Sequence, residues 1–441
     1  MNQSLAPLSL SAFDQDPQVQ VTRLPSGLRI VSETMPHLAT VSVGLWIGCG
    51  ARHERPDEHG LAHLIEHMAF KGTTTRTARQ LVEEIENVGG DLNAETTAET
   101  TAYFARVMAE DVPLALTLLS DIVVNPLFAA EELAREKEVI LQEIASYEDN
   151  PDELVFDLVM QHAFPDHPLG RPILGTPDSL NSFTPAHLNT FVRRHYQPSQ
   201  IVVAAAGAVD HAALVAQAEQ CLAALPSSPQ PEPLQAQYQG GDLRSKKRLE
   251  QVHVVIGAQG VSVHDPLHES LHVLAHLLGG GMSSRLFQEL REKRGLCYDV
   301  NAFFTPFSDT GLFGISGGTS PQHLEAFLDI TLQEWQQLAT TLTEDEISRA
   351  KAQIKVGLLV GSESAGRRAD QLARQMLAYN LIPSRAALIH RIEAVDRDGL
   401  IQALHRLKAA PPTLVILGPQ GGLPDKSQFQ SQFSLDFAKN T

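Results

Sequence analysis

The amino-acid sequence predicts an α+β fold of two tandem homologous domains, each a mostly antiparallel β-sheet covered by helices. The same order of strands and helices occurs twice, offset by about 212 residues, so that TVSVGLWIG (40–48) corresponds to QVHVVIGA (251–258). Between the copies lies a segment rich in Pro, Ser, Gln and Gly that lacks apolar periodicity. We therefore expect domains over residues 1–225 and 248–441, joined by a linker over residues 226–247.

Short runs with alternating apolar residues, rich in Val, Ile and Thr, mark the strands of the first copy. These runs cover residues 19–24, 28–34, 40–48, 91–96, 100–107 and 200–207. Helical periodicity marks helices at 77–90, 112–123, 129–147, 153–164 and 185–196, besides a short one near residues 59–70. Thr77 is a suitable N-cap for the helix that begins after it, and Gly89 is a suitable stop.

The second copy repeats this order. A strand over 250–258 is followed by the helix LHESLHVLAHLLGG (267–280) and the helix SRLFQELREKRG (284–295). Strands then cover 297–307 and 311–318, and further helices lead to the terminal strand TLVILG (413–418). Strands that follow one another closely favour antiparallel pairing in both copies.

Composition is that of an ordinary globular protein, with 43% hydrophobic and 20% charged residues. No apolar run approaches the roughly 20 residues that span a bilayer, so we expect no membrane association. The first basic residue is Arg23, which fits neither a secretory signal nor an Arg-rich transit peptide. Three widely spaced cysteines without a CxxC pattern fit a reducing compartment. We expect a bacterial cytoplasmic protein rather than a mitochondrial matrix protein.

The net charge of −18 is concentrated in the first copy. Residues 1–225 carry 13 basic and 30 acidic side chains, a balance of −17, whereas residues 226–441 carry 21 and 22. This asymmetry argues against a nucleic-acid partner and favours a cationic partner at the first copy. The alternative is that the acidic surface serves only solubility.

The stretch HGLAHLIEHMAFKGT (59–73) places ionisable residues on an otherwise apolar helix. His63 and His67 are four residues apart, so a helix stacks both imidazoles on one face, where they can reach a single metal ion. Glu66 is close enough to address a water on that ion, in an inverted form of the HExxH arrangement. The alternative is a solvated helix face, but Leu64 and the other apolar neighbours disfavour it.

Two histidines do not hold a catalytic zinc, so a third protein ligand is expected. The helix AEELAREKEVILQEIASY (130–147) places Glu136 and Glu143 on one face with Leu133, Val139 and Ile140. One of these carboxylates is expected to ligate the metal and the other to support it, and spacing alone does not distinguish them.

His59, one turn before His63, is a rival ligand, although its polar flank favours a position at the helix entrance. The second copy provides an internal control. It reads LAHLLGG, with apolar residues where the first copy has His63, Glu66 and His67. The ligand-type residues are therefore not required by the fold.

With these features in place, the chain resembles the pitrilysin-like metallopeptidases, or inverzincins, and most of all the catalytic β subunit of the mitochondrial processing peptidase and its bacterial relatives. The similarity runs from LPSGLRIVSE through HLIEHMAFKGT and REKEVILQEI to GGGMSSRLFQELREKRGLCYDV. In that family the two motif histidines and a glutamate about 76 residues after the second bind zinc. The resemblance therefore implies His63, His67 and Glu143 as ligands of one Zn²⁺ per chain.

The resemblance also implies roles for other residues. The family's general base matches Glu66, and a further helix glutamate matches Glu136. An Arg and a Tyr from the metal-free domain, which hold the substrate carbonyl in the family, match Arg291 and Tyr298 in REKRGLCY. Donors of this kind can stabilise an oxyanion.

The family's edge strand, on which a peptide substrate adds as an extra strand, resembles GGDLNAETTAETTAY (89–103). Asn93, Ala94 and Glu95 lie there, and a plain hairpin strand is the alternative. Pitrilysin itself joins four such units in one chain, so this two-unit chain would be half of a clamshell and need a partner. Because the chain carries both the metal motif and the Arg/Tyr pair, a homodimer is favoured over a heterodimer.

These observations predict a zinc-dependent endopeptidase that cleaves short or unfolded, cationic peptides. A Glu general base would act on a metal-activated water. The alternative is a non-catalytic structural subunit, like the core proteins of a respiratory complex that share this architecture. Such subunits tend to have eroded metal motifs, whereas this motif is intact.

Overall fold

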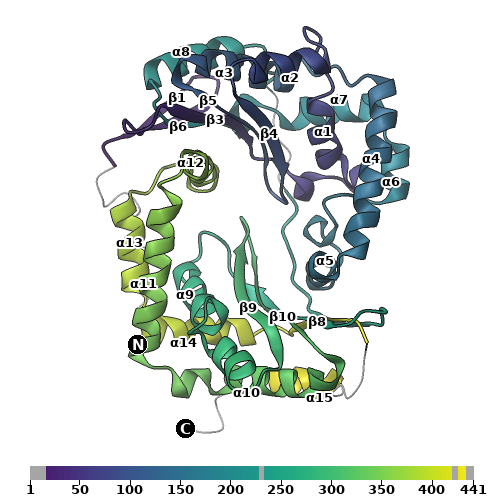
Figure 1. The fold of residues 1–441 in the computed structure, drawn as a ribbon, viewed down its shortest axis with the longest axis vertical. Helices are drawn as coiled ribbons and strands as arrows, with labels where there is room; N and C mark the ends of the chain where they lie inside the picture. The colour runs from purple at the N-terminus through teal and green to yellow at the C-terminus, as the bar shows by residue number, and fades with distance from the viewer. Residues whose placement is uncertain (1–15, 228–232, 420–425, 434–441) are drawn as a thin grey trace.

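The computed structural model describes residues 16–227, 233–419 and 426–433, which form two sheets, one in each half of the molecule (Figure 1). The strands of the first sheet are β1 (Val19–Arg23), β2 (Arg29–Thr34), β3 (Thr40–Ile47), β4 (Asp91–Thr96), β5 (Thr101–Met108) and β6 (Ile201–Gly207). They lie in the order β1-β2-β6-β3-β5-β4. Only the β2–β6 pair among them is parallel, so the sheet is mostly antiparallel and β4 is an edge strand.

The second sheet repeats this arrangement. Its strands are β7 (Gly241–Ser245), β8 (Val252–Gly260), β9 (Cys297–Pro306), β10 (Gly311–Thr319) and β11 (Thr413–Leu417). The order β7-β11-β8-β10-β9 matches β2-β6-β3-β5-β4, and the parallel pair, β7 with β11, is in the same place. The predicted duplication of a mostly antiparallel α+β unit is therefore confirmed, and β9 is the counterpart of the edge strand β4.

One part of the chain differs from the predicted domain division. Strand β7 lies inside residues 226–247, the segment predicted as a linker, and it pairs along its whole length with β11. All five of its residues are half-buried, and its sequence, GDLRS, lacks the alternation of apolar and polar residues by which a strand is recognised.

Helices cover both sheets. In the first half they are α1 (Leu61–Ala69), α2 (Ala78–Glu86), α3 (Val112–Val124), α4 (Ala130–Asp149), α5 (Pro151–Ala163), α6 (Pro177–Ser182), α7 (Pro185–His195) and α8 (His211–Cys221). In the second half they are α9 (His268–Gly279), α10 (Leu324–Thr341), α11 (Glu344–Gly361), α12 (Ala365–Tyr379), α13 (Arg385–Ala394), α14 (Arg397–Lys408) and α15 (Lys426–Phe433). The predicted cap at Thr77 is present, since its hydroxyl accepts a hydrogen bond from the Gln80 amide. None of the helices in the described part of the chain is long and apolar enough to cross a membrane.

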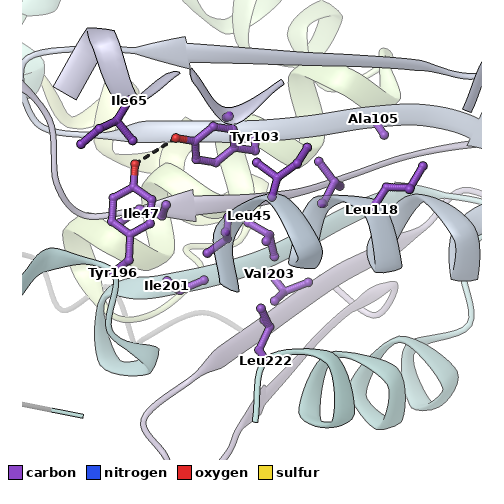
Figure 2. Close-up of a cluster of buried hydrophobic side chains, with 14 of the residues drawn as sticks. Leu45, Ile47, Ile65, Tyr103, Ala105, Leu118, Tyr196, Ile201, Val203 and Leu222 are labelled. Atoms are coloured by element: carbon purple, nitrogen blue, oxygen red, sulfur yellow. Dashed lines mark hydrogen bonds between the residues drawn. The ribbon is translucent and has the colours of Figure 1, made fainter. Parts of the chain in front are cut away.

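The main core of the first half lies between its sheet and helices that include α1 and α3 (Figure 2). Ile65 of α1 packs there with strand residues such as Leu45 and Val203. Two buried phenols meet within this apolar cluster, because the hydroxyls of Tyr103 and Tyr196 are 2.9 Å apart and satisfy each other. This core holds the apolar face of α1, while His63 and His67 of α1 lie toward α4.

Each half contributes one helix that packs on the sheet of the other half. Helix α12, from the second half, packs on the first sheet, where Leu372 and Met376 join a buried cluster with Val202 and Ala204 of β6. Helix α5, from the first half, joins a cluster with strands of the second sheet. Figure 1 shows α12 beside the first sheet and α5 beside the second. The predicted cut between domains therefore separates each sheet from one helix that covers it.

We expect Leu372→Ala to destabilise the whole molecule, because Leu372 is 0% exposed in the contact between the halves. A buried Leu→Ala change leaves a cavity and costs about 2–5 kcal/mol. Leu359→Ala on α11 is the matched control, since Leu359 is 43% exposed and its loss should change stability by less than about 0.5 kcal/mol. Urea denaturation measures both. Equal midpoints for the two variants would contradict the structural role given to α12.

Candidate metal centre

Helix α1 begins at a tightly built turn. Its N-cap, Gly60, has φ +89°, and a Cβ there would lie 2.6 Å from the Cα of Gly175, so only glycine fits. The buried carboxylate of Glu54 accepts hydrogen bonds from the amides of Gly60 and Ala62, at 2.9 and 2.7 Å. Burial raises the pKa of Glu54 to about 8, although these two amide donors oppose the shift. Glu54 thus caps α1, a role not anticipated from the polar loop before the motif.

The two histidines of the metal motif lie on the polar face of α1, where this helix meets α4. The Nε2 atom of His67 lies 3.4 Å from Oε2 of Glu143, and Nε2 of His63 lies 3.9 Å from the same oxygen. One ligand atom from each of the three residues falls within 4.8 Å of the others. Two residues of α1 and one of α4 are thus brought together across more than 70 positions of sequence.

This geometry fits a zinc ion. Zinc bonds of 2.0–2.2 Å to nitrogen and oxygen in a tetrahedral site put neighbouring ligand atoms about 3.3 Å apart. The separations at Glu143 are close to that value. Nδ1 of His63 is buried and has no hydrogen-bond partner within the described residues, so the polar contact of this ring is made by Nε2, toward Glu143. Two imidazoles and a carboxylate with a fourth position free form the ligand set of a catalytic zinc site.

Glu136, 5% exposed, lies on the other side of His67. Its Oε2 is 3.1 Å from Nδ1 of His67. A carboxylate that accepts the Nδ1 proton leaves the Nε2 lone pair directed toward Glu143, which is the tautomer a metal ligand needs. The predicted apolar stripe on α4 needs one correction, because Val139 is 41% exposed and lies outside the buried face that contains Glu136 and Ile140.

Before any ion binds, burial lowers the pKa of His63 to about 4, and the neighbouring His67 reinforces this shift. The imidazole is therefore neutral at pH 7, as a metal ligand must be. His59 does not join the cluster, because its Nε2 lies 2.8 Å from the carbonyl oxygen of Pro172. It belongs to the turn before α1, as its polar flank indicated.

Glu66 lies between the metal residues and the edge strand β4. Burial raises its pKa above the ordinary glutamate value, and the charges of Glu95 and Glu143 add to this effect. The side chain of Thr96, at the end of β4, lies close to Glu66 and lowers its pKa, as does His67. A carboxylate beside both a metal ligand set and a free strand edge can exchange protons with groups bound there. The contact with Thr96 had no signal in the sequence.

The three predicted residues of β4 do not all face the same way. Asn93 and Glu95 are exposed, while Ala94 is half-buried and packs on the core of the first half. Oε1 of Glu95 lies 3.5 Å from Nη2 of Arg374, which comes from α12. Strand β4 pairs only with β5 in the described part of the chain, so its other edge has free backbone groups.

Arg291 and Tyr298 come together in the second half. Arg291 lies in the π-helix η7 (Phe287–Glu292), within the segment predicted as an ordinary helix, and Tyr298 lies on the edge strand β9. The Arg291 guanidinium stacks 4.9 Å from the centre of the Tyr298 ring, which is 79% exposed. Among the described residues no hydrogen bond or ion pair joins either of them to His63, His67 or Glu143.

Helix α9 occupies the place of α1 in the second unit. It reads LAHLLGG where α1 reads LAHLIEH, so His276 stands in place of His63, which corrects the expectation of apolar residues alone. Glycines 279 and 280 replace Glu66 and His67. Nε2 of His276 lies 2.9 Å from the side-chain oxygen of Gln353 on α11. Within the described residues the second unit therefore has no counterpart of the metal cluster.

Two family models match consecutive segments of the chain, and their boundary falls before β6, which belongs to the first sheet. Residues 29–177 match the model described as insulinase (peptidase family M16), and residues 182–354 match the peptidase M16 inactive domain. The residues of the metal cluster all lie in the first match, and α9 with its two glycines lies in the second.

Curated relatives extend over most of the chain. A protein of Rickettsia felis is 37% identical over 90% of this chain and 97% of its own length, and one of Streptomyces coelicolor is 38% identical over 91% and 90%. A Bacillus subtilis relative is 34% identical over 90% and 98%. All three are described as uncharacterised zinc proteases.

Two solved structures share the fold. A protease from Helicobacter pylori superposes with a TM-score of 0.86 at 21% identity, over 91% of this chain and all of its own. A structure described as a peptidase M16 inactive domain, from Pseudomonas fluorescens, gives 0.84 at 24%, over 92% and 100%. At these identities the two structures show the shared fold, and the family models with the curated relatives show the family. The chain belongs to peptidase family M16, the pitrilysin-like family.

Proposed function

We propose that this protein is a zinc-dependent endopeptidase. The observation that carries the proposal is the position of Glu66 on α1, beside the cluster of His63, His67 and Glu143 and close to Thr96 at the end of β4. One place thus combines a metal ligand set, a proton acceptor and a free strand edge. Three curated relatives described as zinc proteases support the same reading.

His63, His67 and Glu143 would hold the ion. Zinc in such a site supplies Lewis acidity, which polarises a carbonyl and lowers the pKa of water to about 7. Glu66 accepts the proton that the attacking water loses and returns it to the leaving amine. Glu136 holds His67 in the required tautomer through Nδ1. We propose that Arg291 and Tyr298 bind the substrate carbonyl, as the resemblance implied.

The proposed substrates are short or unfolded peptides. An extended peptide can pair with the free edge of β4, where Asn93, Ala94 and Glu95 lie, and backbone hydrogen bonding of this kind requires an unfolded segment. The excess of acidic residues in the first half favours cationic peptides. This activity would be closest to that of a processing peptidase.

Chelation tests the proposed activity directly. We expect the purified protein to cleave a quenched fluorescent peptide that carries basic residues, and to lose cleavage when a chelator removes the metal, because no other group in the cluster activates water. Added zinc should restore it. Cleavage that is insensitive to chelation, in protein shown to be metal-free, would refute the mechanism.

A non-catalytic structural role is the competing outcome of the same assay. Protein that binds zinc but cleaves no peptide, alone or with a related chain, would favour that role. The homodimer and the cytoplasmic location stay predictions. A native mass measurement tests the first, since half of a clamshell needs a second copy to enclose a substrate.

A further inference from the structure

Lys71 makes a contact with the metal centre that the proposed mechanism does not use. It follows the end of α1, and its Nζ lies 2.6 Å from Oε1 of Glu136. The other oxygen of the same carboxylate, Oε2, lies 3.1 Å from Nδ1 of His67. Lys71, Glu136 and His67 thus form a continuous chain of polar contacts. It ends at the His67 imidazole, whose Nε2 is directed toward Glu143.

We propose that Lys71 is a positioning residue of the metal centre, which acts by holding the Glu136 carboxylate in the orientation that orients His67. This inference rests on the proposed function, because it assumes that His67 ligates a metal. A carboxylate as buried as Glu136 needs a counter-charge, and removal of the only cation bonded to it among the described residues leaves it uncompensated. The side chain would then turn or shift, and His67 would lose its support.

The backbone around Lys71 is fixed, as a positioning role requires. The amide of Lys71 donates to the carbonyl of Met68, in the last turn of α1. Two residues later the hydroxyl of Thr73 donates to Asp121 of α3 at 2.6 Å, and Arg76 pairs with the same carboxylate. Lys71 therefore approaches Glu136 from a segment attached to both α1 and α3, while its own side chain is only 33% exposed.

The test compares three variants of the full chain. Lys71→Met removes the charge and keeps most of the side-chain volume, whereas Lys71→Arg keeps a cation that can reach the carboxylate. Arg79→Met is the matched control, since it also removes one positive charge from the first half, at a side chain that is 84% exposed. The readout is the zinc dissociation constant of the apoprotein, measured by competition with a chelating dye.

Loss of a group that supports a metal-ligating histidine weakens metal binding about 10- to 100-fold. We expect a change in that range for Lys71→Met, a change of less than about threefold for Lys71→Arg, and none for Arg79→Met. Thermal unfolding of the apoproteins checks that Lys71→Met folds, and Lys71→Gln replaces it if it does not.

The possible failures are distinguishable. Wild-type affinity in Lys71→Met, tighter binding, or equal losses in Lys71→Met and Arg79→Met would overturn the role of Lys71 and leave the zinc site in place. A wild-type protein that binds no zinc would overturn both the proposed function and this inference. Unchanged affinity with lost cleavage would show that Lys71 contacts substrate instead, which also contradicts the proposal.

Discussion

Replacing Glu66 by Gln should leave zinc bound and remove peptide cleavage. The amide has the shape of the carboxylate but cannot accept a proton, and Glu66 is not among the three residues of the metal cluster. General-base catalysis contributes about 10²- to 10⁴-fold, so turnover should fall at least by that factor. A quenched-peptide assay measures the rate, and metal analysis of the same sample measures the zinc.

Glu138→Gln is the matched control for this experiment. Glu138 lies on the exposed side of α4, so the same loss of one negative charge should alter neither zinc content nor turnover. Near wild-type turnover in Glu66→Gln would remove Glu66 from the mechanism. Loss of zinc in that variant would instead assign Glu66 to the ligand set.

Replacing Glu143 by Gln should remove the zinc itself. The cluster offers one atom from each of three side chains, and Glu143 supplies its only negative charge. A neutral amide is a poor zinc ligand, so two histidines would hold the ion alone. We expect purified wild-type protein to retain about one zinc per chain after gel filtration and the variant to retain almost none.

The comparison with Glu136→Gln separates the two carboxylates of α4. Glu136 contacts His67 at Nδ1, away from the other ligand atoms, so its loss should weaken zinc binding about 10- to 100-fold without abolishing it. A larger loss of zinc in Glu136→Gln than in Glu143→Gln would show that the two assignments are reversed.

Much of the fold was predictable because its elements have strong local signals. Alternation marked strands such as β3, and a side-chain cap marked the start of α2. The misses have physical causes. Strand β7 is half-buried throughout and has no alternation. The packing of α12 on the first sheet depends on contacts between residues more than 160 positions apart, such as Leu372 and Val202, and no local pattern encodes those.

The metal site was likewise predictable only in the part that local sequence determines. The spacing of His63 and His67 determines that they share a helix face, and this could be predicted from the motif. Spacing could not separate Glu136 from Glu143, because both lie on the same side of α4. Their difference is tertiary, since one meets Nδ1 of His67 and the other meets Nε2. The contacts of Glu54 and Lys71 could not be predicted either, because they too depend on the tertiary structure.

The exchange of α5 and α12 has a mechanical consequence. One apolar face of each sheet is buried by a helix that the opposite half contributes, so neither half is an independent module. Cleavage of the backbone between residues 227 and 233 would not free the two pieces from one another. Buried apolar clusters and ion pairs between the halves, such as that of Arg368 with Glu33, would hold the pieces together.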